Sequence, residues 1–401
     1  MQTLRGIRVL DLSRVLAGPF CTMGLGDLGA EIIKVEEPGS GDETRGFGPP
    51  FVKGVSTYFL SINRNKRSLA VNLKHPEGVQ LIHALAARSD VAVENFRPGV
   101  ADRLGVGFER LRAENGRLIY CSISGFGHRG VPEHTKLPGY DAVMQGVAGL
   151  QHLTGQPEGP PTKVGISIAD ILTGMTAMQA ILLALFSRER TGTGSRLDIS
   201  MLDSTVQALT FQAANHLIAN LNPGRAGNRH ASIAPYETFR AKDGYLNLGV
   251  ANDGQFKKLC QLLGAPALAD DPRFAQNRKR VENREDLAQR LGAVFLTRPV
   301  GEWIEVLQGA GIPAGAILDL AQLFAHPQLH ARGMLVETNH PILGPTRMVG
   351  SPLNAAQPGS DERPLPPPSV GEHTAEVLIS VLGLSSAEVE RLAAAQAIAL
   401  K

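Results

Sequence analysis

Short runs of valine, isoleucine and leucine alternate with helical patterns along the first half of the chain. The runs predict strands, and glycine, proline and polar breaks separate them from segments that predict helices. The predicted strands are Ile7–Leu12, Glu31–Glu36, Ser68–Lys74, Asp90–Glu94, Leu118–Ser124 and Ser195–Ser200. The predicted helices are Leu16–Gly29, Pro76–Arg88, Arg110–Glu114 and Met201–Asn220. Strands that alternate with helices indicate a parallel sheet, so we expect an α/β fold with a large Rossmann-like domain.

The stretch from Lys163 to Gly174 carries an isolated carboxylate between two apolar segments. It predicts a short strand that ends at Asp170, followed by a helix over Met175–Phe186. A carboxylate at such a junction can lie at the mouth of an α/β sheet, where ligands bind. It can equally be the N-cap of the helix that follows. The local sequence leaves both interpretations open.

A break rich in glycine, proline and asparagine at Asn222–Asn228 predicts a domain boundary. We expect a large domain over 1–220, completed by about 330–401, and a smaller α/β domain over 228–325, with linkers near 205–228 and 320–340. The small domain is predicted to contain strands Tyr236–Phe239 and Gly244–Val250 and helices Gly254–Leu263 and Val300–Gln308. The tail holds a proline-rich run, Arg363–Ser369, interpreted as a tether, and an amphipathic helix near Ser386–Ile398.

The composition limits the functions open to this chain. Its 401 residues are 43% hydrophobic and 19% charged with a net charge of +2, which suits a globular enzyme and lacks a nucleic-acid or polybasic membrane footprint. Three scattered cysteines predict reduced thiols. The N-terminus lacks the apolar region of a signal peptide, and the helix within Ile171–Phe186 is expected to be too short to span a bilayer. We expect a cytoplasmic protein with neither nucleic-acid nor membrane partners.

Common cofactor and nucleophile motifs are not found where they would act. No G-x-G-x-x-G fingerprint directly follows the first predicted strand, and the glycines up to Gly29 lie at a predicted helix end. The sequence has no Walker A loop and no G-x-S-x-G elbow, and its histidines lack metal-ligand spacing, so no metal is expected. Cations instead accompany the predicted strands, with three in Asn63–Ser68, two in Glu94–Arg103, and Lys74. Each cluster alone can be a solvated surface. Together at strand ends of one sheet, they indicate a site for the phosphates of a nucleotide-like ligand.

Segments along the whole chain match a known pattern. They are Leu4–Leu12, Ala17–Pro19, Leu25–Glu36, Gly39–Asp42, Asn65–Ser68, Glu94–Gly99, Gly139–Asp141, Asp170, Thr191–Gly194 and Gly371–Thr374. On these segments the chain resembles the class III CoA-transferases, the family of formyl-CoA transferase and carnitine CoA-transferase. The resemblance implies an enzyme that moves CoA from an acyl-CoA to a carboxylic acid, with a CoA thioester as substrate and no permanently bound cofactor. It also implies an interlocked, ring-shaped homodimer.

The resemblance gives Asp170 the role of nucleophile. Its carboxylate would attack the acyl-CoA carbonyl to give a mixed anhydride and CoA thiolate, which then form an aspartyl-CoA thioester. The acceptor acid attacks in turn and leaves with the CoA. Tyr140 and Asp141 fall on the family's active-site tyrosine–carboxylate pair. Backbone N–H groups near Asp170 are expected to stabilise oxyanions, and the site must exclude water.

The CoA contacts of the family carry over residue by residue. They fall on Leu16, Ala17, Val71, Asn72, Leu73, Lys74, Asn95, Phe96, Arg97, Arg103 and Lys136. A structural role is the alternative for each of them. Asn95, for example, can cap a turn, and Lys136 can be a free surface amine.

Two other functions stay open. The related α-methylacyl-CoA racemases carry a histidine where this chain has Tyr140, and a phenol is a poorer base than imidazole near neutral pH. The replacement removes the partner that racemisation needs, so it favours the transferase. A non-catalytic acyl-CoA-binding protein is the third possibility, and it would bind CoA esters without turnover.

One region departs from formyl-CoA transferase. That enzyme has a glycine-only loop in its small domain, whereas this chain has Gly227–Tyr236, which argues against oxalate and formate as the acid pair. This segment, with Pro49–Phe51 and Ser56–Lys66, resembles the succinate–hydroxymethylglutarate (glutarate) CoA-transferase branch. A dicarboxylate needs a cationic partner for its second carboxylate. The candidates are Arg45, Arg64 and His230.

Overall fold

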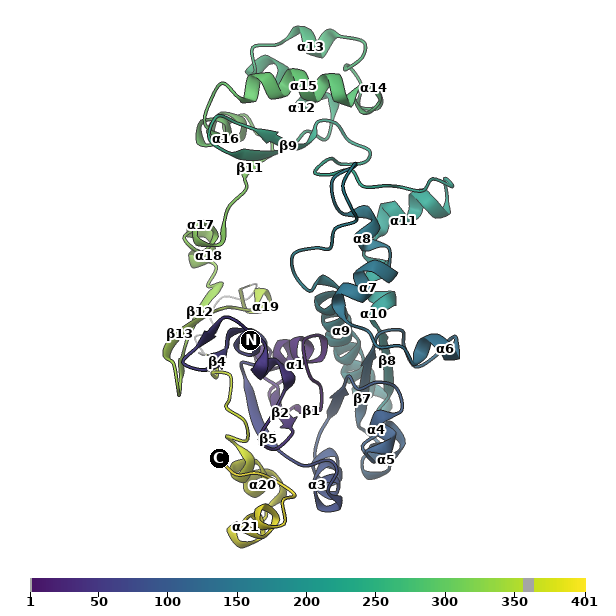
Figure 1. Cartoon of the computed structure of the whole chain (residues 1–401), viewed down its shortest axis with the longest axis vertical. Coiled ribbons are helices and arrows are strands. Elements are labelled where there is room, and N and C mark those ends of the chain that lie inside the picture. The colour runs from purple at the N-terminus through teal and green to yellow at the C-terminus, as the bar shows by residue number, and fades with distance from the viewer. Residues whose placement is uncertain (1, 356–363) are drawn as a thin grey trace. The chain divides into compact units, whose positions relative to one another are not determined.

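The computed structural model describes residues 2–355 and 364–401. It divides into two compact units, both drawn in Figure 1. The first comprises Met1–Leu150, Lys163–Leu221 and Pro327–Lys401, and the second comprises Gln151–Thr162 and Asn222–His326. The predicted domain and linker boundaries stay predictions. Arg363, the first residue of the predicted proline-rich run, lies outside the described residues.

The first unit is built on a parallel sheet of six strands. The strands are β1 (Arg8–Asp11), β2 (Glu31–Glu36), β5 (Lys66–Ala70), β6 (Val91–Glu94), β7 (Ile119–Ser124) and β8 (Arg196–Ser200). Their order across the sheet is β5-β2-β1-β6-β7-β8, and every neighbouring pair is parallel. The direction of this order reverses between β1 and β6, as in doubly wound folds. The predicted α/β fold with a parallel sheet is confirmed.

Helices cover both faces of this sheet (Figure 1). Successive strand residues point to opposite faces, so Val9 and Leu10 enter different apolar cores. Val9 packs with α1 (Ala17–Asp27) and α9 (Ile168–Thr191). Leu10 belongs to the core that contains the other helices, namely α3 (Pro76–Ala86), α5 (Phe108–Glu114), α20 (Thr374–Leu382) and α21 (Ser386–Ala394). The C-terminal tail therefore completes the first unit.

Two sequence predictions in this unit are wrong. Residues 163–167 form no strand, and α9 begins at Ile168, so Asp170 lies inside the first helical turn. The apolar alternation misleads because the Val164 N–H donates to the Gln145 side chain at 2.8 Å instead of to a neighbouring strand. The predicted helix Met201–Asn220 is two helices, α10 (Met201–Gln207) and α11 (Thr210–Leu217).

The length predicted for the central apolar helix is also wrong. α9 has 24 residues and a mean hydropathy of 1.7 in its most apolar window, so by length and composition it could cross a membrane. Core helices of globular proteins pass the same test, and one third of that window is buried within the unit. Ala177 and Ile181 of α9 lie fully buried in the core beside the sheet.

The second unit has an antiparallel sheet of three strands, in the order β11-β10-β9. These are β9 (Tyr236–Arg240), β10 (Tyr245–Gly249) and β11 (Ala314–Ala316). The helices are α12 (Asp253–Leu262), α13 (Ala267–Asp270), α14 (Asn277–Glu282), α15 (Arg284–Phe295), α16 (Val300–Gly309) and α17 (Leu320–Phe324). Phe295 packs edge-to-face on Trp303 at a centroid distance of 5.2 Å in its core.

Short elements complete the chain. They are η1 (Glu43–Gly46), β3 (Phe51–Val52), β4 (Val55–Ser56), α2 (Thr57–Ser61), α4 (Val100–Arg103), α6 (Pro132–Thr135), α7 (Asp141–Val147), α8 (Leu150–Leu153), α18 (Pro327–Ala331), β12 (Leu335–His340), β13 (Gly344–Val349) and α19 (Pro352–Ala355). Of these, α2 and α7 matter most for the site because they lie beside the N-terminus of α9.

Candidate active site

A cavity of about 150 Å³ lies where β1, β6 and β7 end. It is lined by the segments that follow these strands, and it marks the point where the strand order reverses. Ligands of doubly wound folds bind at such a point. Seven of the predicted site residues line it together, namely Leu16, Ala17, Asn95, Phe96, Arg97, Tyr140 and Asp170.

Close packing of two helices brings Asp170 to this cavity. Gly174, one turn after Asp170, lies against the start of α1, where a Cβ at Gly174 would come within 2.6 Å of the Ala17 carbonyl oxygen. Any larger residue would push α9 away from α1. The glycine therefore allows the first turn of α9 to lie beside Leu16 and Ala17, which line the same cavity.

Asp141 supplies the cap that α9 itself lacks. The N-cap residue of α9 is Ser167, whose side chain makes no capping hydrogen bond. The Ala169 N–H instead donates to Asp141 Oδ1 at 2.9 Å, and the Gln145 side chain donates to Asp141 Oδ2 at 2.7 Å. Asp170 is thus not the N-cap. Asp141 does not line the cavity. It acts instead on the first turn of the helix that carries Asp170, by accepting the Ala169 N–H.

The Asp170 carboxyl has a strongly perturbed pKa. Burial, and to a smaller extent the negative charge of Asp141, raises this pKa from its ordinary value to about 7. At neutral pH the carboxyl therefore exchanges its proton readily. A partly desolvated carboxylate with such a pKa, facing a cavity, is typical of a reactive group.

Tyr58 also lies close to Asp170, although no sequence motif points to it. It lies in α2, half-buried, and its hydroxyl shares a hydrogen bond with the Ser167 side chain. Burial raises the pKa of the Tyr58 hydroxyl, and the nearby charge of Asp170 adds to this effect. No local pattern marks Tyr58, because its contact with α9 comes from a distant part of the sequence.

The other predicted CoA contacts lie outside the cavity. Val71 is buried and bridges to Ile398, and the Asn72 N–H donates to the Ala397 carbonyl. Leu73 packs against the core that contains α3 and α20. The remaining three, Lys74, Arg103 and Lys136, are exposed.

The cations of Asn63–Ser68 do not form a phosphate site, contrary to the sequence prediction. Lys66 is fully buried and donates to Asp11 at 3.1 Å. Arg67 pairs with Glu31 and Glu376. The segment runs into β5, which begins at Lys66, so these cations lie at the amino end of that strand. There they pair with carboxylates of the protein itself.

The three candidate partners for a second carboxylate occupy different places. Arg45 binds Glu36 through two nitrogens at 2.7 and 2.8 Å, and Arg64 binds Asp27 at 2.5 and 2.8 Å. Neither lines the cavity of Asp170. His230 belongs to the second unit, where its ring lies 5.3 Å from that of Tyr236.

Comparisons with known proteins agree with this fold. A model of CoA-transferase family III matches residues 4–374. A succinyl-CoA:glutarate CoA-transferase of Mus musculus is 44% identical over 392 residues, covering 98% of this chain and 89% of that protein. Its namesake from Homo sapiens is 43% identical over 382 residues, covering 95% and 86%. A CAIB/BAIF family protein of Brucella suis, known from its crystal structure, has a TM-score of 0.82 and 40% identity, covering 94% of this chain and 99% of that one.

The chain therefore belongs to CoA-transferase family III. It is an enzyme, and its activity is CoA transfer. The prediction from the sequence motifs is confirmed at this level, including the resemblance to the glutarate branch. The roles of individual site residues stay predictions.

Proposed function

We propose that this enzyme transfers CoA from succinyl-CoA to a dicarboxylate such as glutarate or hydroxymethylglutarate, through an aspartyl-CoA thioester on Asp170. The observation that carries the proposal is the placement of Asp170, a half-buried carboxylate with a pKa of about 7, in the cavity at the carboxyl end of the sheet. The names of the two mammalian relatives support the choice of acids.

The first half of the reaction transfers CoA to the enzyme. An Asp170 oxygen attacks the thioester carbon of succinyl-CoA, the C–S bond breaks, and CoA leaves as a thiolate. A mixed anhydride of Asp170 and succinate remains. The thiolate attacks the Asp170 carbonyl carbon, the anhydride C–O bond breaks, and succinate leaves. The product is the Asp170–CoA thioester.

The second half reverses these steps with the acceptor. An acceptor carboxylate oxygen attacks the Asp170 thioester carbon and releases CoA thiolate, which leaves a new anhydride. The thiolate then attacks the acceptor's acyl carbon, and the Asp170 carboxylate is released. Each step replaces one carboxylate or thiolate by another, so no external acid, base or resident cofactor is needed. CoA is a substrate throughout.

The environment of Asp170 favours this exchange. Burial removes part of the hydration that would weaken a carboxylate nucleophile. The bound substrates would have to exclude the remaining water from the two hydrolysable intermediates. We propose that CoA lies along Leu16, Ala17, Phe96 and Arg97, with Tyr140 beside the reacting carbonyl. The exposed cations Lys74, Arg103 and Lys136 would meet its phosphates.

The acceptor's second carboxylate needs a cation, and Arg45, Arg64 and His230 stay the candidates. Arg45 and Arg64 would each have to leave an existing carboxylate partner. Substituting each of the three by methionine, and comparing turnover with a mono- and a dicarboxylate, tests this part. The residue that binds the second carboxylate is the one whose loss affects only the dicarboxylate.

We further propose that the enzyme works as an interlocked homodimer in the cytoplasm. Large exposed apolar side chains occur on α9 and at the end of α11 in the single chain, including Leu183 at 69%, Leu217 at 78% and the C-cap residue Ile218 at 81%. Exposed apolar side chains that gather into a patch mark protein interfaces.

The test is to incubate the purified enzyme with succinyl-CoA and a panel of carboxylic acids and to follow the acyl-CoA products. We expect a dicarboxylate to gain CoA, and the Asp170→Asn variant to form none. Deuterium exchange at the α-carbon of an acyl-CoA without an acceptor acid would support racemisation instead. Tight binding of acyl-CoA without turnover by the unaltered enzyme would indicate a binding protein.

A further inference from the structure

The turn between β1 and α1 has an unusual backbone. Val15 has φ = 68°, in the left-handed region where β-branched residues are rarely found. Val15 lines the cavity beside Leu16 and Asp170. Such strained residues persist only where their surroundings hold them, and they occur often at functional sites.

Asn95 holds this turn from across the sheet. The Arg14 N–H donates to Asn95 Oδ1 at 2.8 Å, and Asn95 Nδ2 donates to the Arg14 carbonyl at 2.6 Å. One side chain thus binds both polar groups of a residue next to Val15. Asn95 follows β6 and Arg14 follows β1, so these hydrogen bonds join the ends of the two neighbouring strands between which the strand order reverses.

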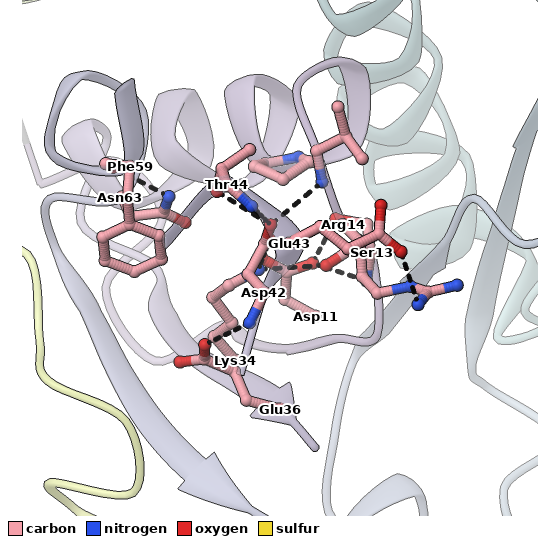
Figure 2. A network of polar contacts seen from close by, with 12 residues as sticks. Asp11, Ser13, Arg14, Lys34, Glu36, Asp42, Glu43, Thr44, Phe59 and Asn63 are labelled. Carbon is pink, nitrogen blue, oxygen red and sulfur yellow. Dashed lines mark hydrogen bonds and ion pairs between the residues drawn. The ribbon is translucent and has the colours of Figure 1, made fainter. Parts of the chain in front are cut away.

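A buried network of charged side chains, which includes Lys34 and Asp42, also binds this turn (Figure 2). Lys34 and Asp42 are fully buried and pair at 2.8 Å. Lys34 also donates to the Ser13 carbonyl at 3.0 Å, and Asp42 Oδ1 accepts the Val15 N–H at 3.3 Å. The Ser13 N–H donates to Asp11 at 3.0 Å. Side chains therefore bind consecutive backbone groups from Ser13 to Val15, which fixes the turn.

We infer that Asn95 is a positioning residue that holds the Ser13–Val15 turn, and with it the first turn of α1, in place against Asp170. This rests on the proposed function, and it gives Asn95 a role other than the CoA contact implied by the family resemblance. The Lys34–Asp42 pair is the fixed support on the other side of the turn. When the turn shifts, the wall of the cavity shifts with it, and the thioester no longer meets Asp170 in a reactive geometry.

The test compares three variants in transfer from succinyl-CoA to glutarate. Asn95→Leu removes both hydrogen bonds to Arg14, while Asn95→Asp keeps the acceptor and loses the donor. The matched control is Asn115→Leu. Asn115 is also half-buried, and it also donates to backbone carbonyls, those of Ala86 and Ser89. These contacts lie before β6 and β7, at the amino ends of the strands and away from the cavity.

We expect Asn95→Leu to lower kcat by about 10- to 100-fold with KM for succinyl-CoA within about twofold of the unaltered value. Asn95→Asp should have an intermediate kcat, and Asn115→Leu should change kcat less than about twofold. A rise in KM for succinyl-CoA with unchanged kcat would show a direct CoA contact and overturn the inference. Unchanged kinetics would also overturn it. Absence of transfer by the unaltered enzyme would overturn the proposed function itself, and the inference with it.

A second measurement distinguishes positioning from general destabilisation. Glycine adopts φ = 68° without a side-chain clash, so Val15→Gly makes the turn less dependent on Asn95. We expect Asn95→Leu to lower kcat only about threefold or less in the Val15→Gly background. An equal loss in both backgrounds would mean that Asn95 does not act through the turn.

Discussion

Asp141 and Asp170 meet at one helix end: Asp141 accepts the N–H of the residue before Asp170, and its charge helps to raise the pKa of Asp170. Asp141 thus caps the helix that carries Asp170 and also raises the pKa of the Asp170 carboxyl. Asp141 holds its own place through the fully buried Gln145, which donates to it at 2.7 Å. The arrangement links the fold of α7 directly to the chemistry of the cavity.

The pH dependence of the reaction follows from the state of Asp170. Its carboxylate form is the nucleophile, and its pKa is raised from 3.8 to about 7. We therefore expect kcat/KM for succinyl-CoA to fall about tenfold per pH unit well below pH 7 and to reach a plateau above it. Initial rates between pH 5 and 9, at constant ionic strength, check this. A rate that stays constant down to pH 5 would show that Asp170 is not the group that must ionise.

Replacing Asp141 should move this profile. Asp141→Asn removes a negative charge beside Asp170, so the inflection is expected to shift to lower pH. Burial, the larger cause, stays in place, and the inflection should therefore remain above the value of an ordinary aspartate. Asp203→Asn is the matched control, because Asp203 is an exposed carboxylate in the first turn of α10. A shift to higher pH in Asp141→Asn would contradict this account of the pair.

The Arg64–Asp27 ion pair is predicted to stabilise the fold. Both side chains are buried and bind through two contacts, at 2.5 and 2.8 Å. Arg64→Met leaves the Asp27 charge buried without this partner, which should lower the free energy of unfolding by about 3–5 kcal/mol. Urea denaturation measures this loss, and adding Asp27→Asn should restore part of it. If Arg64→Met keeps full stability but loses only dicarboxylate turnover, Arg64 is a substrate ligand instead.

The exposed apolar side chains at the end of α11, Leu217 and the C-cap residue Ile218, should form part of a subunit interface. Leu217→Lys combined with Ile218→Lys is expected to weaken the dimer at least tenfold, or about 1.4 kcal/mol, because burying the lysines carries a desolvation penalty. Ile379→Lys is the control, since Ile379 is an exposed apolar residue on α20, which packs on the face of the sheet opposite α9. Sedimentation velocity over a range of concentrations distinguishes the outcomes. A monomeric unaltered enzyme would refute the dimer.

Hydrophobic patterning predicted the main sheet because buried parallel strands are continuous apolar runs between glycine and proline breaks. The prediction failed at 163–167, where apolar residues suggest a strand but no neighbouring strand is present. There the Val164 N–H donates to the Gln145 side chain. The two cases differ in contacts between distant residues, which the local sequence pattern does not show. The length of α9 was underestimated because its polar residues, such as Thr173 and Thr176, donate to carbonyls within the helix and do not end it.

The site could be predicted only in part. Family motifs identified seven residues of one cavity, Asp170 among them, whereas the local sequence left open whether Asp170 caps a helix or lies at a ligand site. Tyr58 and the Asn95–Arg14 pair were missed because their functions arise from tertiary contacts. Arg45 and Arg64 were candidates for the second carboxylate of the substrate because of their charge, yet both bind internal carboxylates. A sequence shows the charge of a residue but not the partner that neutralises it.

The most direct test of the central claim is to trap CoA on Asp170. The enzyme is mixed with succinyl-CoA without an acceptor and then treated with hydroxylamine, whose nitrogen attacks the aspartyl thioester carbon and displaces CoA thiolate. We predict a hydroxamate at Asp170, found by peptide mass spectrometry in the unaltered enzyme and absent from Asp170→Asn. A hydroxamate on a different residue, or full transfer activity in Asp170→Asn, would contradict the proposed mechanism.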